Sequence, residues 1–173
     1  EQGVAQLAED PYPDRLTLST LPSFAGRWLV PRLGRFQQQA PNLHINLSPG
    51  LQLASFENSE LDLAIRFGRG DYPGLSSRLL FKDYLLPVCH PSLIQADKPV
   101  LEQLQKLPLL IDSAPDMDLL WSEFEAAMGI SRSRQSSRLS VTDSAMLVEA
   151  LLSAQGLSVI RFSLAYELLE RGL

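Results

Sequence analysis

The sequence predicts an α/β fold with mainly parallel sheets and with helices on the faces of those sheets. Short segments that alternate apolar and polar residues, as strands do, recur from one end of the chain to the other. Segments with apolar residues at helical spacing separate them, which is typical of βαβ units. Proline and glycine mark most junctions, and no internal repeat or low-complexity tract interrupts the alternation.

Each element is expected from its local pattern. Strands are expected at 16–19, 43–47, 61–65, 109–111, 139–141 and 157–160, and within the β-prone stretch 76–91. Helices are expected at 24–40, 51–59, 91–95, 99–105, 118–128, 144–155 and 164–170. The polar, turn-rich residues 1–14 are expected to be a linker that enters the domain.

Several residues predict where helices begin, bend and end. Ser23 is a good N-cap for the helix that follows it. Pro31 lies inside that helix, where proline costs about 3 kcal/mol, so we expect a kink or a restart there. Gly129 and Gly156 follow two later helices and are expected to terminate them.

Composition excludes several classes of protein. The 173 residues are 45% hydrophobic and 20% charged, which fits one globular domain or two small lobes. Cys89 is the single cysteine, so an internal disulfide is excluded and a thiol-based metal site is disfavoured. The net charge of −5 argues against a nucleic-acid-binding module in this segment. No apolar run is long enough to span a membrane. The chain begins at Glu1 without methionine or a signal peptide, so we expect a fragment.

Catalytic signatures are absent from the sequence. It contains no phosphate-binding P-loop, no dinucleotide-binding glycine motif and no nucleophile elbow. His44 and His90 are not at ligand spacing with each other or with a carboxylate. Cys89 and His90 are neighbours on an expected strand, so their side chains point to opposite faces. The sequence therefore predicts no catalytic residue, no metal site and no cofactor.

A binding site is the remaining prediction. Ligands of α/β sheets bind beyond the carboxyl ends of strands, where helix N-termini offer free N–H groups. Small polar residues occupy three such junctions, at 19–23, at 48–50 leading towards Ser55, and at 142–144. The candidates are Thr20, Pro22, Ser23, Gly50, Ser55, Thr142, Asp143 and Ser144. A purely N-capping role is the alternative for Ser23 and for Asp143 or Ser144.

Longer runs resemble a known family. The run SFAGRWLVPRLGRFQQQAPNLHINL resembles the first helix and second strand of the effector-binding domain of LysR-type transcriptional regulators. The run LDLAIRFGRGDYPGLSSRLLFKDYLLPVCHPSL resembles their crossing into a second lobe. The pairing of WLVPRL with DLAIRFG is most similar to the branch of the glycine-cleavage activator and the β-lactamase regulator. The later runs KLPLLID, WSEFEAAMG and VTDSAMLVEALLSAQGLSVI fit the second lobe in order and spacing.

The resemblance implies a two-lobed fold like the type 2 periplasmic binding proteins. Residues 1–14 would be the end of a linker helix and a linker. Lobe I would comprise 15–84 with 161–173, and lobe II would comprise 85–160. Relatives carry an N-terminal winged helix-turn-helix and continue beyond ERGL, so the C-terminal part of lobe I is expected to be missing here. A second glycine that relatives carry after the lobe II helix is replaced by Ser158.

The resemblance also assigns roles to site residues. Ser23 matches a hydroxyl that contacts effectors, and Ser55 falls where one branch has an acidic ligand contact. The run 142–144 matches the lobe II junction. Arg66 either faces the cleft entrance or pairs with Asp62. Arg161 either holds an effector carboxylate bidentately or forms a salt bridge.

The function that the resemblance implies is ligand sensing in a bacterial, cytoplasmic transcription factor without enzymatic activity. The effector would be a small polar metabolite such as an amino acid or organic acid. DNA would be bound by the missing N-terminal domain, and the protein would form homodimers or homotetramers without membrane contact. Pairing of copies would use the helices near 27–38 and 145–155. A periplasmic solute-binding protein of the same fold, and an enzyme on a bilobed scaffold, are the alternatives.

Overall fold

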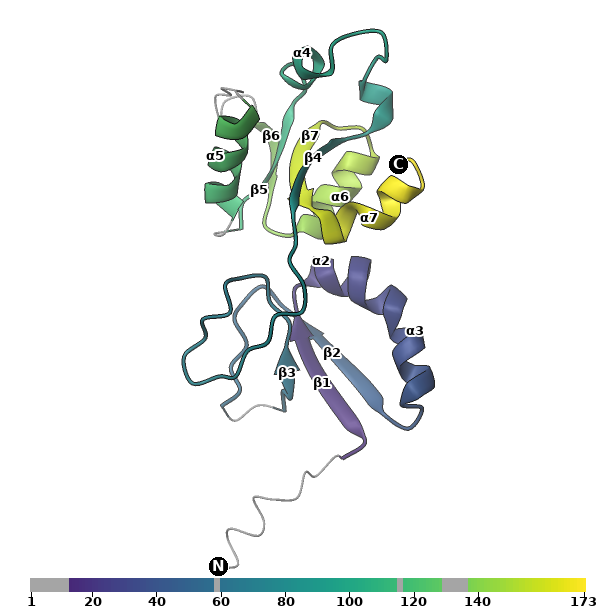
Figure 1. The fold of residues 1–173 in the computed structure, drawn as a ribbon, viewed down its shortest axis with the longest axis vertical. Coiled ribbons are helices and arrows are strands. Elements are labelled where there is room, and N and C mark those ends of the chain that lie inside the picture. The colour runs from purple at the N-terminus through teal and green to yellow at the C-terminus, as the bar shows by residue number, and fades with distance from the viewer. Residues whose placement is uncertain (1–12, 58–59, 115–116, 129–136) are drawn as a thin grey trace, which may run out of the picture.

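The computed structural model describes residues 13–57, 60–114, 117–128 and 137–173, which form two sheets one above the other (Figure 1). The first sheet contains β1 (Arg15–Thr20), β2 (His44–Pro49) and β3 (Leu63–Ala64). Its strand order is β2-β1-β3, and both neighbours pair with β1 in parallel. The predicted parallel α/β arrangement is therefore confirmed in this half.

One continuous helical segment follows β1 and contains the predicted restart. It consists of α2 (Pro22–Phe24), the π-helical turn η1 (Ala25–Leu29) and α3 (Val30–Gln39). Pro31 lies in the first turn of α3, where its missing N–H costs no helical hydrogen bond. The helix is interrupted by the wider π-helical turn immediately before α3, and this interruption is the restart predicted from Pro31.

The second sheet contains β4 (Leu85–Cys89), β5 (Leu109–Asp112), β6 (Ser137–Val141) and β7 (Leu157–Arg161). Its order is β4-β7-β5-β6, with β4 antiparallel to β7 and the other pairs parallel. The helical elements of this half are η2 (Pro91–Leu93), α4 (Val100–Leu104), α5 (Met117–Met128), α6 (Ser144–Leu152) and α7 (Phe162–Glu170). The chain crosses into this half once within its described part, just before β4 (Figure 1).

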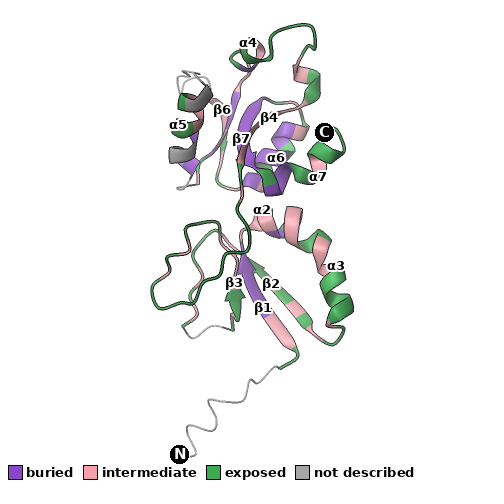
Figure 2. Ribbon diagram, in the orientation of Figure 1, coloured by how far each residue is buried: buried purple, intermediate pink, exposed green. Residues whose placement is uncertain are grey.

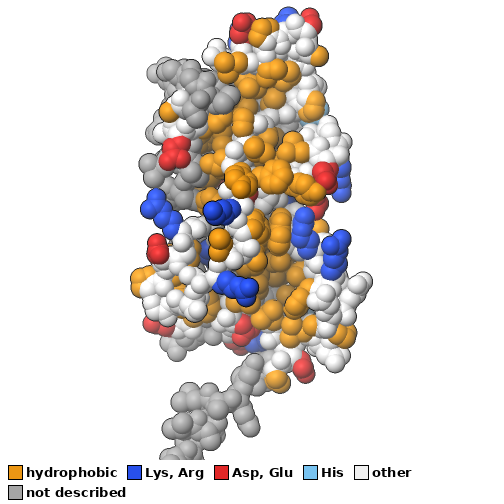
Figure 3. All heavy atoms as spheres, in the orientation of Figure 1, with side chains coloured by type: hydrophobic (Ala, Val, Ile, Leu, Met, Phe, Trp, Pro, Cys, Tyr) orange, Lys and Arg blue, Asp and Glu red, His pale blue; other side chains and the backbone are white. Residues whose placement is uncertain are grey.

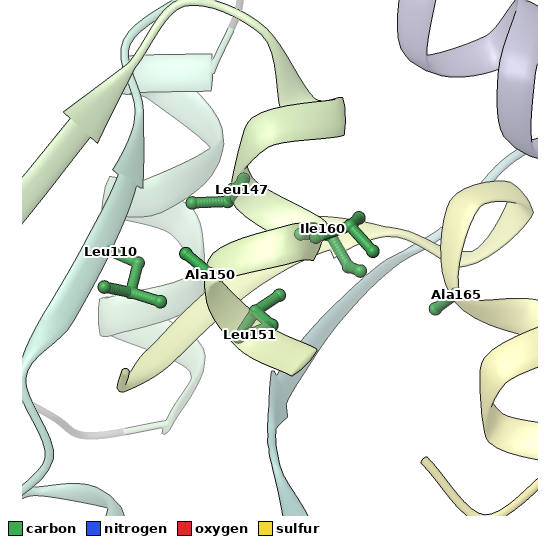
Figure 4. Close-up of a cluster of buried hydrophobic side chains, with 7 residues drawn as sticks. Leu110, Leu147, Ala150, Leu151, Ile160 and Ala165 are labelled. Carbon is green, nitrogen blue, oxygen red and sulfur yellow. The ribbon is translucent and has the colours of Figure 1, made fainter. Parts of the chain in front are cut away.

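Alternate residues of β5 and β7 enter two different hydrophobic clusters. Leu110 and Ile160 pack with Leu147, Leu151 and other residues of α6, and with Ala165 of α7 (Figure 4). The neighbouring positions on the same strands belong to the other cluster, which contains Leu104, Leu109, Trp121, Leu157 and Val159. Strand side chains alternate between faces, so both faces of this sheet are covered.

The first sheet is much less buried than the second (Figure 2). All five residues of β7 are buried, whereas β2 alternates exposed and half-buried residues and α3 contains no buried residue. In the first half the fully buried segment is the carboxyl end of β1, where Thr17 to Thr20 are all buried. The most completely buried part of the first half therefore leads directly into α2.

Three expectations of secondary structure are corrected by the structure. No helix forms over the described residues 51–57 of the expected helix 51–59. The side chains of Leu51 and Leu53 are exposed, so these apolar residues find no surface to pack on that would favour a helix. The β-prone stretch 76–91 yields only β4, and the expected helix 91–95 is a short 3-10 turn.

The end of α6 differs from the glycine stop that was expected. Ala154 adopts the left-handed conformation, with φ of 55°, and the N–H of Ala154 bonds to the carbonyl of Leu151. Gly156 has another role: a Cβ there would lie 2.3 Å from the carbonyl oxygen of Pro108. That close approach of two backbones requires glycine. Gly129, the other expected stop, lies outside the described residues.

Helix α7 contacts both halves. Ala165 packs in the cluster of the second sheet, and Glu167 forms an ion pair with Arg32 of α3 at 3.1 Å. The division into 15–84 with 161–173 and 85–160 stays a prediction. Ser158, which replaces an expected glycine, is fully buried and donates a hydrogen bond to the carbonyl of Leu110 at 2.7 Å. No helix in the described ranges is long and apolar enough to cross a membrane.

Candidate functional site

The carboxyl end of β1 places Thr20, Pro22 and Ser23 beside the second half. Leu21 is the N-cap of α2 and makes no side-chain capping bond, so the expected capping role of Ser23 is wrong. Pro22 occupies the first turn, and Ser23 lies inside the helix with 3% of its surface exposed. Thr20 is 1% exposed, and its Oγ1 atom has no hydrogen-bond partner among the described residues.

Arg66 lies on the same side, just after β3. Its Nη2 atom donates to Ser19 Oγ at 2.7 Å and to the carbonyl of Gln52 at 3.0 Å. The considered pairing of Arg66 with Asp62 does not form, because Asp62 instead accepts a hydrogen bond from the backbone N–H of Thr17. The Nε and Nη1 atoms of Arg66 are buried without a partner in the described chain. This burial lowers the pKa of Arg66 below its usual value.

Gly50 and Ser55 lie in the segment that follows β2. The N–H of Gly50 donates to the carbonyl of Thr20 at 2.9 Å, so this residue ties the end of β2 to the end of β1. Ser55 is exposed and lines neither of the two hollows described below. Thr142 of the second half is likewise exposed and outside both.

The N-terminus of α6 holds a buried polar network. Asp143 caps the helix through its carboxylate, which accepts from the N–H of Ala145 at 2.9 Å. The hydroxyl of Ser144 donates to the carboxylate of Asp112, and the Nη2 atom of Arg161 donates to Ser144 Oγ at 2.9 Å. The three members of this network, Asp112, Ser144 and Arg161, are buried, with 1%, 4% and 7% of their surfaces exposed.

Asp112 is a member of this network that the sequence analysis did not single out. It ends β5, and its carboxylate also accepts from the N–H of Ala114 at 3.0 Å. The signal was present, because an acidic residue at the carboxyl end of an apolar parallel strand lies at the edge where such sheets bind ligands. What the sequence did not reveal is that Ser144 and Arg161 converge on this side chain.

Two hollows lie where the halves meet. The larger, of about 1530 Å³, is open and is lined by Thr20, Phe24, Arg66, Phe67, Arg161 and Ser163 among others. The smaller, of about 650 Å³, lies between α2 and α6 and is lined by Pro22, Ser23, Arg27, Asp143, Met146 and Glu149 among others. The structure thus brings Thr20, Arg66 and Arg161 together, and separately brings Pro22, Ser23 and Asp143 together.

Several contacts join the two halves around these hollows. The guanidinium carbon of Arg161 lies 4.9 Å from the centre of the Phe67 ring, in a cation–π contact. Arg27 of η1 forms an ion pair with Glu149 of α6. On the face drawn in Figure 3, Lys and Arg side chains gather at the level where the halves meet. The salt bridge considered as one alternative for Arg161 does not form with any carboxylate of the described residues.

Aromatic side chains fix the crossing segment to the first half. Phe81 packs against Trp28 with ring centres 5.2 Å apart, and Trp28 stacks on Phe24 at 5.0 Å. At the other end of the crossing, the carboxylate of Asp83 accepts hydrogen bonds from the N–H and the hydroxyl of Ser163 at the start of α7. The crossing segment beside the larger hollow is therefore anchored at both of its ends.

Metal chemistry finds no support in this arrangement. Within the ranges that the structure describes, no three His, Cys, Asp or Glu side chains are grouped so as to hold a metal ion. The thiol of Cys89 is half-buried, and burial raises its pKa, so it is held in the unreactive protonated form near neutral pH. What the site offers is hydroxyl groups and guanidinium groups for binding a small polar molecule.

Comparison with known proteins defines the class to which this architecture corresponds. The LysR substrate binding domain family matches residues 10–173. The glycine cleavage system transcriptional activator of Escherichia coli K12 is 35% identical over 159 residues, which are 91% of this chain and 51% of that protein. The activator AmpR of Citrobacter koseri is 32% identical over 85% of this chain and 54% of its own length. The chain therefore belongs to the LysR substrate binding domain family.

Solved structures agree with this assignment at the level of the fold. The AmpR effector binding domain from Citrobacter freundii has a TM-score of 0.75 at 22% identity, covering 92% of this chain and 78% of that one. The regulator CrgA from Neisseria meningitidis has a TM-score of 0.71 at 20% identity, covering 99% of this chain and 58% of that one. The predicted family and two-lobed fold class are confirmed. The named relatives are transcriptional regulators and not enzymes, and this chain spans about half the length of the curated relatives.

Proposed function

We propose that this chain is the ligand-sensing part of a bacterial LysR-type transcription factor. It binds a small polar metabolite between its two halves and thereby controls DNA binding by a winged helix-turn-helix domain outside this chain. The observation that carries the proposal is that buried Thr20, half-buried Arg66 and buried Arg161 line one hollow at the junction of the halves. Such polar groups are costly to bury without partners, and a bound ligand supplies partners.

The proposed ligand contacts divide into direct contacts and supporting residues. Thr20, Arg66 and Arg161 line the larger hollow and are proposed as direct contacts. Pro22, Ser23 and Asp143 border the smaller hollow, where they shape the approach of α2 to α6. Gly50 and Ser144 support their neighbours through hydrogen bonds. Ser55 and Thr142 are exposed, and nothing in the structure favours a ligand contact for either.

A ligand acts on such a protein only if it binds one arrangement of the halves more tightly than another. Here the halves are connected by one described crossing and by side-chain contacts such as Arg27–Glu149 and Arg161–Phe67. These contacts are few and partly exposed, so breaking and re-forming them costs little free energy. Ligand binding at the junction therefore can bias the position of one half against the other.

Oligomer formation and cytoplasmic location are part of the same proposal. The protein is proposed to form homodimers or homotetramers through α3 and α6. Leu147 and Leu151 of α6 are explained by packing within their own core, but Val30, Phe36 and Met146 are 50%, 41% and 61% exposed. Exposed apolar residues on these two helices are what a contact between copies would cover. A protein that acts on DNA works in the cytoplasm of a bacterium.

The test combines a metabolite screen with the gene sequence. Thermal unfolding of the chain is measured with amino acids, organic acids and related small polar metabolites, and a binder raises the midpoint temperature through mass action. Codons upstream of Glu1 should encode a helix-turn-helix and a basic wing. A signal peptide there would instead favour the periplasmic solute-binding alternative. The chain alone should show no measurable binding to duplex DNA at physiological salt. Tight, salt-sensitive binding would contradict the proposal that a domain outside this chain binds the DNA.

A further inference from the structure

Arg161 is a buried cation with no carboxylate partner among the described residues. Only 7% of its surface is exposed, and arginine stays charged at any physiological pH. Among the residues that the structure describes, its guanidinium makes one hydrogen bond, to Ser144 Oγ, and no ion pair. Its other contact is the ring face of Phe67. A buried charge held by one neutral hydroxyl is unfavourable unless a further partner is supplied.

The direction of the hydrogen bonds shows what Ser144 can and cannot do. An ionised Asp112 can only accept, so the single hydroxyl hydrogen of Ser144 is donated to it. Ser144 Oγ is then left as an acceptor, and Arg161 Nη2 donates to it. Ser144 therefore has no hydrogen left to donate to a ligand. It orients Arg161, whose remaining N–H groups are the donors that this network offers.

The surroundings of Arg161 are positive although the chain as a whole is acidic. The larger hollow is lined by five basic and three acidic residues, whereas the whole chain has a net charge of −5. Two of the three acids are already engaged: Asp62 accepts from Thr17, and Asp83 accepts from Ser163. Arg66, whose Nε and Nη1 atoms have no partner among the residues that the structure describes, lines the same hollow. The excess positive charge in this hollow is thus available to an anion.

We propose that the molecule bound in this hollow carries a carboxylate group, that Arg161 binds that group, and that Asp112 and Ser144 act as positioning residues for Arg161. The inference rests on the proposed sensing function and narrows its ligand class. A planar guanidinium fork matches a carboxylate and can donate two parallel hydrogen bonds. Thr20, whose buried Oγ1 has no hydrogen-bond partner in the described chain, provides a neutral polar contact in the same hollow.

Acetate is the probe that tests this proposal without knowledge of the natural ligand. The ¹⁵N-labelled chain is titrated with sodium acetate, and the arginine Nε–H signals are followed by NMR. Acetamide, which has the same shape without the charge, and sodium chloride at equal ionic strength are the controls. The expected result is a saturable shift of the Arg161 signal in the millimolar range with acetate, and none with acetamide. Absence of an acetate-specific saturable shift would overturn the proposal.

Substitutions at Arg161 and Ser144 show where acetate binds and whether Ser144 positions Arg161. Arg161→Gln should abolish acetate binding, and Arg171→Gln, at an exposed arginine beyond α7, should leave it unchanged. Arg161→Lys keeps the charge but loses the fork, so we expect binding about tenfold weaker. Ser144→Ala should weaken acetate binding several-fold and Ser144→Thr, which keeps the hydroxyl, should restore it. Equal binding by the alanine and threonine variants would contradict the positioning role.

The experiments distinguish a failure of the carboxylate proposal from a failure of the proposed ligand-sensing function. A metabolite screen that finds a neutral ligand while the acetate titration fails overturns the carboxylate proposal and leaves the sensing function standing. If Arg161→Gln does not fold, the titration of the unmodified chain and of Arg161→Lys still decides the question, because both keep the buried charge.

Discussion

The two sheets differ sharply in how completely they are packed. β7 and the core of β5 are covered on both faces, and both clusters of buried hydrophobic residues found in the described chain belong to this second sheet. β2 and α3 of the first half are mostly half-buried or exposed (Figure 2). Burial of apolar surface is the main stabilising term in folding. The second half therefore provides most of the stability, and the first half is the part that opens at lower cost.

This difference has a functional meaning at the junction. The network of Asp112, Ser144 and Arg161 is built on the well-packed half, so its geometry is preformed. Phe67, whose ring contacts the guanidinium of Arg161, comes from the loosely packed half. Elements that move on ligand binding are drawn from the less stable parts of a protein. A ligand held by Arg161 would thus bring a mobile half against a fixed one.

Cavity-forming substitutions should give the largest contrast between the halves. Leu147 is fully buried between α6 and the second sheet, so Leu147→Ala should lower the free energy of unfolding by about 3–5 kcal/mol. Leu47 of β2 is only half-buried, and Leu47→Ala should cost less than about 2 kcal/mol. Urea denaturation of both variants measures the difference. Equal losses would mean that the first half is packed as well as the second.

Two glycines give a contrast of opposite sign. A Cβ at Gly156 would meet the carbonyl oxygen of Pro108 at 2.3 Å, so Gly156→Ala should destabilise the chain by about 1–3 kcal/mol. Gly34 lies in α3, and no atom lies within 4 Å of the place that a Cβ would take there. Gly34→Ala should therefore stabilise the chain by about 0.5–1 kcal/mol. The midpoints of thermal unfolding report both changes. Destabilisation by Gly34→Ala would show that α3 is more tightly enclosed than its exposure indicates.

The ion pair between the halves should have the smallest effect. Glu149 is largely exposed, with 70% of its side chain accessible, so its pairing with Arg27 is screened by solvent. A double-mutant cycle of Arg27→Gln and Glu149→Gln should give a coupling energy below about 1 kcal/mol, decreasing further in high salt. Arg35→Gln, at an exposed position on α3, is the matched control. A coupling of several kcal/mol would show that this pair locks the halves together.

Much of the fold could be predicted from the sequence because its signals are local. Strand β1 and strand β7 follow from short apolar segments, and Pro31 predicts the restart at α3. The expected helix at 51–59 was wrong because periodicity says nothing about whether a surface exists to bury it. Gly156 was assigned to the wrong role for a related reason: the close approach of Pro108 is a contact between segments far apart in the sequence.

The site was predictable only in part. Thr20, Arg66 and Arg161 were expected as candidates and do line one hollow, although their role in binding stays a prediction. Asp112 was missed, since its importance depends on a hydrogen bond to Ser144, which lies 32 positions away. The capping of α2 was misassigned to Ser23 because the helix begins earlier than its polar residue suggests, with Leu21 as the N-cap.

Hydrogen exchange tests the central claim, that a small molecule bridges a rigid half and a looser half, most directly. Exchange of backbone amides in the chain is followed by mass spectrometry, with and without the compound selected by the metabolite screen. We predict slow exchange in β5 and β7 in both samples, and faster exchange in β2 and α3. Addition of the compound should slow exchange at α2 and around Phe67 and leave β5 and β7 unchanged. Protection confined to a surface away from the junction, or uniform protection of both halves before the compound is added, would contradict the account.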